Sequence, residues 1–365
     1  MKRTRFLRTL GPFVGAVALS DCSERPERDV NNVTSKLPHA IRGPDPVASH
    51  LTLDRTTARR LKASRLRKGD AIGIVAPAGP VHFKRTELQK ARLHVEQLGL
   101  KPVFAKHVTA QYGYLAGSDD MRAADFNQFA SDPDIRGIFA MRGGYGSMRI
   151  LDQIDYDALA RDPKVILGFS DLTALLNAIT TRTGLVTFHG PVIGHADLGK
   201  TSLDWIEAAT MAAKPLGTLR DKYIRTLTSG NTRGIARGGN LSMISSLCGT
   251  PYEVSFSNTV LILEDVREPP YRIDRMLTQL RLSGGLHRTA GIVLGNFPLC
   301  EPTEDDLPSL TLAETLQNRL SDLGKPVLAQ APIGHIRDQW TVPLGLEAAL
   351  DSDEGTIVFE EAAVE

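Results

Sequence analysis

The 365-residue sequence has only three cysteines, Cys22, Cys248 and Cys300. Three cysteines cannot build a disulfide framework, and the apolar surroundings of Cys248 and Cys300 predict buried, unreactive thiols there. The sequence also lacks Cys-x-x-Cys pairs and the His-Glu-x-x-His motif. A structural zinc site or a metalloprotease site therefore has no support, and we expect neither a metal nor another cofactor.

An excess of charge and long apolar runs are also missing. The formal net charge is +1, so the overall charge does not indicate nucleic acid or an anionic membrane surface as a partner. No run of about eighteen apolar residues occurs, so we expect no ordinary membrane-spanning helix. Apolar residues make up 42% and charged residues 23% of the chain, which is typical of globular proteins, and the length is sufficient for two domains.

The N-terminus differs from the rest of the chain. The basic stretch MKRTRFLR precedes the apolar stretch LGPFVGAVALS, which is the pattern of a secretory signal. Cys22 follows in LSDC, which resembles the box where bacterial lipoproteins are lipidated on cysteine, although Asp21 stands where a small residue is usual. We predict an export signal over residues 1–22 and a periplasmic protein or a lipoprotein anchored through Cys22. The alternative is a cytoplasmic protein in which this stretch is a disordered tail or results from a misassigned start.

The next part of the sequence predicts a linker and an α/β domain. Residues 23–65 are polar and lack periodicity, which predicts a linker. From residue 66, the runs AIGIVAP, KPVFAKHV, IRGIFA and KVILGF predict strands, and RTELQKARLHVEQLGL, MRAADFNQFASDPDI and DLTALLNAITTRTG predict helices. This alternation predicts a mostly parallel sheet flanked by helices, in an N-terminal domain over residues 66–200.

The second half of the chain has its own α/β pattern. We interpret residues 201–231 as an interdomain linker. VLILEDV, GIVLGNF and KPVLAQAPIGH then predict strands, and YRIDRMLTQLRLSGGL and LAETLQNRLSDLG predict helices. We therefore expect a smaller C-terminal α/β domain over residues 232–360.

Ser170 lies at a predicted strand-to-helix turn in the stretch GFSD. A serine on such a turn exposes its hydroxyl at the carboxyl end of the sheet, and the N–H groups at the start of the helix favour developing negative charge. The second glycine of a Gly-x-Ser-x-Gly elbow is absent. On these residues alone, Ser170 or Asp171 could equally cap the helix.

A nucleophilic serine needs a base and a carboxylate that orients the base. His189, His195 and His335 follow apolar runs and lie beside Gly or Pro, where sites form at sheet edges. A satisfied loop histidine is the alternative at His335. Glu264 ends the run LILE, where it could point into a cleft or pair with one of three nearby arginines, Arg267, Arg272 and Arg275.

The stretch MRGGYG, residues 141–146, follows the predicted strand GIFA. Its paired glycines let the backbone approach a ligand and present N–H groups, which suits an oxyanion hole, although tight turns use Gly-Gly more often. A phosphate-binding loop has weak support, because neither Gly-x-x-x-x-Gly-Lys-Ser/Thr nor Gly-x-Gly-x-x-Gly occurs.

Taken together, these segments resemble successive blocks of the LD-carboxypeptidase family of serine peptidases, in the order of that family and from about residue 66 to residue 351. The blocks are GDAIGIVAPAGPV, AMRGGYGSMRILDQIDY, KVILGFSDLTALLNAI, TFHGPV, ARGGNLSMISSLCGTPYE, LILEDVREPPYRIDRMLTQL, GIVLGNF and PVLAQAPIGHIRDQWTVPLG.

The resemblance implies a serine peptidase that removes the terminal D-amino acid of murein tetrapeptide by cleaving its bond to an L-configured centre. It implies Ser170 as nucleophile and Glu264 and His335 as its partners. For the mechanism that follows, we expect N–H groups of Asp171 and of the Gly143-Gly144 turn, with Gly144 as the candidate donor, to form the oxyanion hole. Because a carboxypeptidase must recognise a free carboxylate, Arg142 is a candidate partner for that group. An acidic partner within the fold is the alternative for Arg142. The family also implies a homodimer and a cytoplasmic location, and the N-terminal extension departs from that location.

Two other functions are compatible with these motifs. One is a hydrolase of peptide–nucleotide conjugates of the microcin-immunity type, which some relatives in the family are. The other is an exported lipoprotein that binds muropeptides without cutting them, and the three intact motifs argue against it.

Overall fold

The computed structural model describes residues 60–82, 84–195, 198–306 and 308–365. The predicted export signal, the lipidation of Cys22 and most of the predicted linker at 23–65 lie outside the described residues. Within the described part, no helix is long and apolar enough to cross a bilayer.

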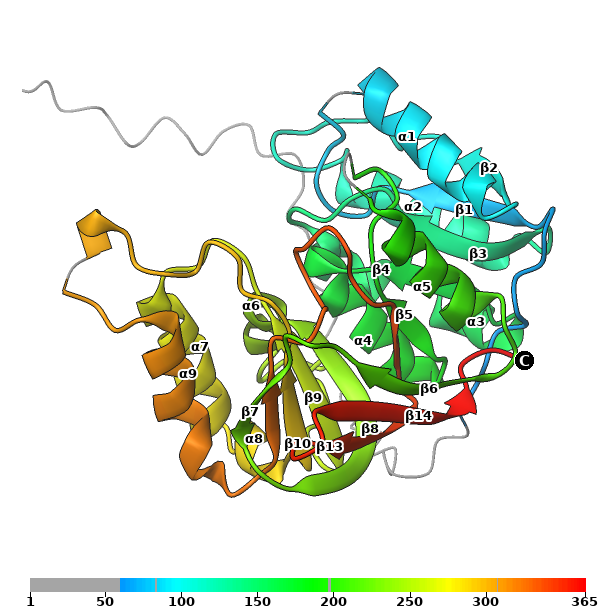
Figure 1. The fold of residues 1–365 in the computed structure, drawn as a ribbon. Coiled ribbons are helices and arrows are strands. Elements are labelled where there is room, and N and C mark those ends of the chain that lie inside the picture. Colours follow the sequence, from blue (N-terminus) through cyan, green and yellow to red (C-terminus); the bar gives the residue numbers. More distant parts are fainter. Residues whose placement is uncertain (1–59, 83, 196–197, 307) are drawn as a thin grey trace, which may run out of the picture. The chain divides into compact units, whose positions relative to one another are not determined.

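The first sheet has six strands in the order β12-β5-β4-β3-β1-β2 (Figure 1). All neighbouring pairs are parallel except β5 with β12, which arrives from the far end of the chain. The carboxyl ends of the five parallel strands therefore meet at one edge. The strands are β1 (Ala71–Val75), β2 (Lys101–Phe104), β3 (Ile135–Ala140), β4 (Val165–Gly168), β5 (Thr187–His189) and β12 (Val342–Leu344).

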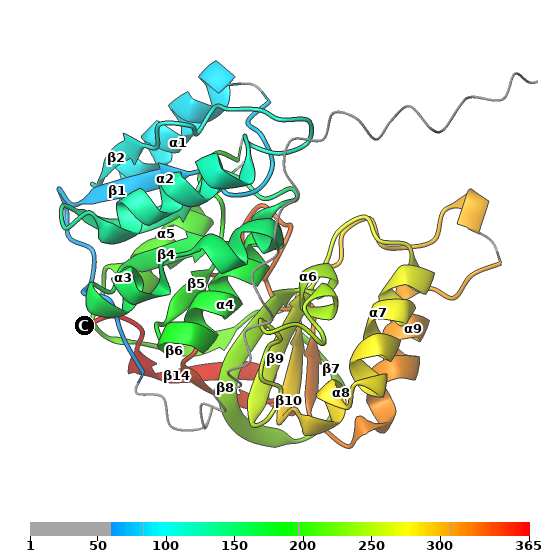
Figure 2. The same ribbon diagram turned by 180° about the vertical axis from the view of Figure 1, so that it is seen from behind.

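Helices cover both faces of this sheet. Helices α1 (Lys84–Gln97) and α5 (Lys200–Thr210) lie in front of it in Figure 1. The reverse view in Figure 2 brings α2 (Asp119–Ser131), α3 (Tyr156–Arg161) and α4 (Thr173–Thr183) to the front. The predicted parallel sheet flanked by helices is confirmed.

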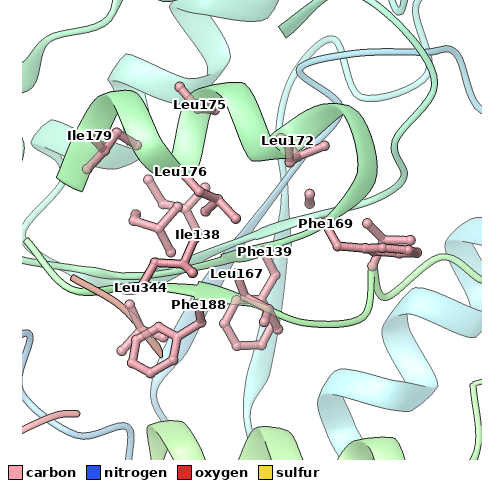
Figure 3. Packing of buried hydrophobic residues seen from close by; sticks show 14 of the residues in the cluster. Ile138, Phe139, Leu167, Phe169, Leu172, Leu175, Leu176, Ile179, Phe188 and Leu344 are labelled. Atoms are coloured by element: carbon pink, nitrogen blue, oxygen red, sulfur yellow. The ribbon is translucent and has the colours of Figure 1, made fainter. Parts of the chain in front are cut away.

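Apolar side chains fill the space between α4 and the sheet. All four residues of β4 are buried, and so are the first eight residues of α4. Figure 3 shows Leu176 and Ile179 of α4 gathered near Ile138 and Leu344 of the strands. Strands covered on both faces read as continuous apolar runs, which is why the run KVILGF was recognisable in the sequence.

The second sheet has eight strands in the order β6-β14-β13-β8-β9-β10-β11-β7. Its centre, β8 to β11, is parallel and its outer pairs are antiparallel. The strands are β6 (Pro215–Arg220), β7 (Arg225–Thr228), β8 (Asn231–Asn240), β9 (Thr259–Glu264), β10 (Gly291–Leu294), β11 (Val327–Ala329), β13 (Glu347–Asp351) and β14 (Thr356–Ala362).

Four helices accompany the second sheet, and short 3₁₀ turns complete the fold. The helices are α6 (Leu241–Ser246), α7 (Pro270–Leu282), α8 (Gly285–Arg288) and α9 (Leu312–Leu320). The 3₁₀ turns are η2 (Ser147–Gln153), η3 (Ser170–Leu172), η4 (Glu304–Asp306) and η5 (Ser321–Leu323). A second apolar cluster includes Ile273, Leu277 and Leu280 of α7 and the strand residues Leu261 and Leu263.

Two segments that the sequence predicted to be linkers contain regular structure or buried residues. Residues 201–231 contain most of α5 and the strands β6 and β7. Both strands lie at edges of the second sheet, and all but one of their residues are exposed or half-buried, so they lack the apolar run that reveals a buried strand. At the end of the other linker, Leu61 pairs with Leu185 and Ala63 is buried.

Candidate active site

Ser170 occupies the sharp turn between β4 and α4. Its φ is 62°, in the left-handed region that a residue with a β-carbon adopts only at a cost. The N-cap residue of α4 is Leu172, and no side chain caps this helix. Neither Ser170 nor Asp171 therefore caps α4, and the turn presents the Ser170 hydroxyl at the carboxyl edge of the first sheet.

Three side chains form a hydrogen-bonded chain at this edge. His335 Nε2 lies 3.0 Å from Ser170 Oγ, and His335 Nδ1 lies 2.7 Å from Glu264 Oε2. Glu264 ends β9 and is fully buried, whereas 20% of the His335 side chain is exposed. Ser170 follows β4 of the first sheet, whereas the other two residues come from the second half of the chain, and the fold brings all three together. A base between a hydroxyl and a buried carboxylate is the arrangement that activates a serine.

The arginines near Glu264 in the sequence do not pair with it. Arg272 pairs with Glu268, and Arg275 lies over the ring of Tyr271. Glu264 contacts His335 instead. Its neighbour Asp265 accepts hydrogen bonds from Asn240 Nδ2, from Ser242 and from the backbone N–H of Val266, which ties the end of β9 to the start of α6.

The Gly143-Gly144 turn lies against the serine. A β-carbon on Gly143 would lie 2.8 Å from Ser170 Cβ and 3.6 Å from the backbone nitrogen of Asp171. Gly144 has a φ of 112°, and a β-carbon there would lie 3.0 Å from Gly79 Cα. Only glycines permit this approach, so the turn and the Asp171 N–H meet at Ser170, as an oxyanion hole requires.

Buried polar contacts hold the turn in place. The Asp171 carboxylate accepts the backbone N–H of Ser147 at 2.7 Å, and burial raises the pKa of this carboxyl. The guanidinium of Arg122, which is 1% exposed, donates to the carbonyl oxygens of Gly146 and Pro77. Arg122 also pairs with Asp119. The residue after the nucleophile and a buried cation therefore brace the same turn.

A pocket of about 860 Å³ opens at Ser170 and His335. It takes lining residues from both halves of the chain, including Arg142, Gly143 and Gly144 from the first and Arg267 and Leu299 from the second. Among the described residues, Arg142 has no ion-pair partner, and its Nε is buried without a hydrogen bond. The predicted carboxylate-binding arginine therefore lines the same pocket as the serine.

Two further rings lie next to the triad: Phe169, which no sequence pattern singled out, and His189, one of the three candidate bases. The Phe169 ring packs against the His335 ring, with centroids 4.7 Å apart. His189 is fully buried, and its Nε2 lies 3.9 Å from Glu264 Oε1. Burial lowers the pKa of His189 to about 4. The motif TFHGPV marked His189 as a histidine after an apolar run, which was the only signal available, and His195 of the same group lines the pocket.

Neither metal ligands nor reactive thiols accompany this site. Over the described ranges, no three His, Cys, Asp or Glu side chains are grouped to hold a metal ion. Cys300 is buried, Cys248 is half-buried, and burial raises the pKa of both thiols, that of Cys300 to about 11. Thiols with raised pKa values are poor nucleophiles at neutral pH.

Comparisons with known proteins agree with this arrangement. A Bacillus subtilis protein named "Probable murein peptide carboxypeptidase" is 38% identical over 307 residues, covering 82% of this chain and 94% of its own. A solved muramoyltetrapeptide carboxypeptidase from Oxalobacter formigenes superposes with a TM-score of 0.70 at 30% identity and covers 80% of this chain and 99% of its own. Microcin C7 self-immunity protein MccF, solved in the wild-type apo state, superposes with a TM-score of 0.76 at 27% identity. The match covers 84% of this chain and 100% of the MccF chain.

Two protein-family models match this chain, one in each half. Residues 72–190 match the LD-carboxypeptidase N-terminal domain, and residues 233–350 match the LD-carboxypeptidase C-terminal domain. Ser170 falls in the first match, and Glu264 and His335 fall in the second. The chain belongs to the LD-carboxypeptidase family of serine peptidases.

Proposed function

We propose that this protein hydrolyses the amide bond between an L-configured centre and the C-terminal D-amino acid of murein tetrapeptide, in peptidoglycan recycling or turnover. The observation that carries the proposal is the chain of hydrogen bonds from Glu264 through His335 to Ser170, the last two of which line the pocket. The names of the B. subtilis and O. formigenes relatives support the choice of substrate.

In the proposed mechanism, His335 Nε2 takes the proton of Ser170 Oγ as the oxygen attacks the scissile carbonyl. Glu264 holds the Nδ1–H of His335 and stabilises the imidazolium that forms. The backbone N–H groups of Asp171 and Gly144 stabilise the oxyanion of the tetrahedral intermediate. His335 then protonates the leaving amine of the D-amino acid. Water, deprotonated by the same histidine, hydrolyses the acyl-enzyme and releases the shortened peptide.

Arg142 supplies the recognition that a carboxypeptidase needs. A substrate with a free C-terminal carboxylate requires a cation near the scissile bond, and guanidinium binds carboxylates through paired hydrogen bonds. Arg142 lines the pocket beside Gly143 and has no acidic partner among the described residues. We propose that it binds the carboxylate of the terminal D-alanine.

The test is incubation of purified protein with murein tetrapeptide, with tripeptide and free D-alanine detected by mass. The wild type is expected to release both products, and Ser170→Ala is expected to release neither. Unchanged hydrolysis by Ser170→Ala would overturn the assignment of the nucleophile.

A second candidate keeps the triad and changes the substrate. The similarity to MccF favours a hydrolase of peptide–nucleotide conjugates as the alternative. An aminoacyl-sulfamoyl adenylate offered in a parallel assay separates the two. Faster hydrolysis of the adenylate than of the tetrapeptide would favour the microcin-immunity type. Labelling of Ser170 by a fluorophosphonate probe separates both enzymes from a lipoprotein that only binds muropeptides.

We further propose that the protein acts in the periplasm or on the membrane as a lipoprotein attached through Cys22. The basic stretch and the apolar run at residues 1–22 support export, and LSDC supports lipidation. Fractionation of cells and mass analysis of the mature N-terminus test both, and full-length protein in the cytoplasmic fraction would contradict them. The homodimer implied by the family is tested by the mass of the purified protein in solution.

A further inference from the structure

His189 is a fully buried imidazole that the proposed mechanism does not use. It ends β5, and neither ring nitrogen has a hydrogen-bond partner among the described residues. Its Nε2 lies 3.9 Å from Glu264 Oε1, which has no hydrogen-bond partner there either. The other oxygen of Glu264 is engaged by His335. A buried donor group therefore faces the carboxylate oxygen that His335 does not use.

Backbone packing keeps these two groups together. A β-carbon on Gly239 would lie 3.0 Å from His189 Nε2, and one on Gly334 would collide with Glu264 Oε2. Both glycines have positive φ, 131° and 101°. Close-packed backbone leaves the imidazole and the carboxylate little room to separate. His189 belongs to the first sheet and Glu264 to the second, so this 3.9 Å approach lies where the two sheets meet, next to His335.

The charge of His189 decides what it does to Glu264. Burial lowers the pKa of His189 to about 4; the charge of Glu264 opposes this effect, and His335 adds to it. The imidazole is therefore neutral at neutral pH. A neutral N–H stabilises an ionised carboxylate without cancelling its charge. A cation there would offset the negative charge that stabilises the imidazolium of His335 during the reaction.

We propose that His189 is a positioning residue that directs its Nε2–H at Glu264 Oε1, the carboxylate oxygen that His335 leaves free, and so holds the carboxylate turned toward His335. It acts through Glu264 and does not touch the substrate. The inference rests on the triad of the proposed function and is independent of which peptide is cleaved.

The experiment measures the rate of Ser170 phosphonylation by a fluorophosphonate between about pH 5 and about pH 9. Three variants separate the donor from the shape of the side chain. His189→Gln carries an amide N–H near the position of Nε2, His189→Asn carries one near Nδ1, and His189→Phe fills the space without a donor.

We expect His189→Asn and His189→Phe to react about tenfold more slowly than the wild type near pH 6, with a deficit that shrinks as the pH rises. The reason is that a buried carboxylate oxygen without a donor is costly only while the carboxylate is charged, so the acid limb of the rate profile should move to higher pH. His189→Gln should stay within about threefold of the wild type. A merely structural role would lower the rate by the same factor at every pH.

His107→Phe is the matched control, because His107 also contacts a carboxylate, Asp125, at 2.8 Å but does not line the pocket. Its profile should match that of the wild type. Thermal denaturation of each variant establishes that it is folded. If His189→Phe does not fold, the pH profiles of His189→Asn and His189→Gln are compared instead, because they differ in the position of the donor.

Profiles of His189→Asn and His189→Gln that both run parallel to the wild type would overturn the inference. Equal shifts of the acid limb in the two variants would also overturn it. A protein that reacts with the probe but leaves murein tetrapeptide intact would refute the proposed substrate and leave the role of His189 unaffected.

Discussion

Gly143 and Ser170 are in such close contact that a single added methyl group on the glycine would lie 2.8 Å from Ser170 Cβ and 3.0 Å from Ser170 Oγ. Separations under about 3 Å between non-bonded carbon atoms are strongly repulsive, so the turn or the serine would have to move. The position of the turn relative to the nucleophile is therefore set by the absence of a side chain.

Gly143→Ala should reduce kcat by about two orders of magnitude, because the displaced turn no longer presents its N–H groups to the oxyanion. Turnover of murein tetrapeptide measures the loss. Gly324→Ala is the control: its β-carbon meets nothing within 4 Å, so it should affect stability alone through its φ of 64°. Full activity of Gly143→Ala would show that the turn takes no part in catalysis.

Ser170 is held in a conformation that costs stability. Its φ of 62° favours glycine. The Ser170→Gly variant should therefore be more stable than Ser170→Ala, with a free energy of unfolding about 1 kcal/mol higher. Both variants lack the hydroxyl and should be inactive, so the comparison isolates the backbone. Denaturant titration gives the two free energies of unfolding. A glycine variant less stable than the alanine variant would mean that the turn carries no strain.

Arg122 should matter for both stability and activity. Arg122→Ala removes a buried cation that donates to Pro77 and Gly146 and leaves Asp119 with fewer partners, which should lower the free energy of unfolding by about 3 kcal/mol. It should also lower kcat, because Gly146 ends the glycine turn. Arg149→Ala removes the exposed partner of the same Asp119 and should change little. Equal effects of the two substitutions would contradict this account.

The low pKa of His189 predicts how stability depends on pH. In the unfolded chain this histidine titrates near its ordinary pKa of about 6.5, whereas in the folded protein the pKa is about 4. Between these two values the unfolded state binds more protons than the folded state. The contribution of His189 to the free energy of unfolding is therefore fully present above about pH 6.5, and it falls by roughly 3 kcal/mol as the pH drops toward 4.

His189→Gln removes this titration, so the difference in free energy of unfolding between wild type and variant should change over that pH range and stay constant above it. Burial raises the pKa of Asp171 and Asp265, which acts in the opposite sense, but these groups are common to both proteins and cancel in the difference. Denaturant titrations at several pH values measure it. A difference that does not vary with pH would mean that His189 is protonated alike in both states.

The elements that carry the site were largely predictable. The strands β4 and β9 and the helix α4 come from buried runs whose apolar residues are contiguous or helically spaced. The edge strands β6 and β7 were missed because exposed strands carry no such signal. β12 was missed because its three residues join the first sheet from a distant part of the chain, which local pattern cannot reveal.

The α/β alternation, the paired glycines that permit a close approach, and the motifs that resemble the LD-carboxypeptidase family could all be inferred from the sequence. The sequence could not decide whether Ser170 caps a helix or whether Glu264 pairs with a neighbouring arginine, because both alternatives use nearby residues. The folded structure answers both questions. His335 is hydrogen-bonded to Glu264, 71 positions away in the chain, and to Ser170, 165 positions away, and these contacts depend on how the two sheets meet. The same long-range packing buries His189 beside Glu264 and gives an otherwise ordinary histidine its low pKa.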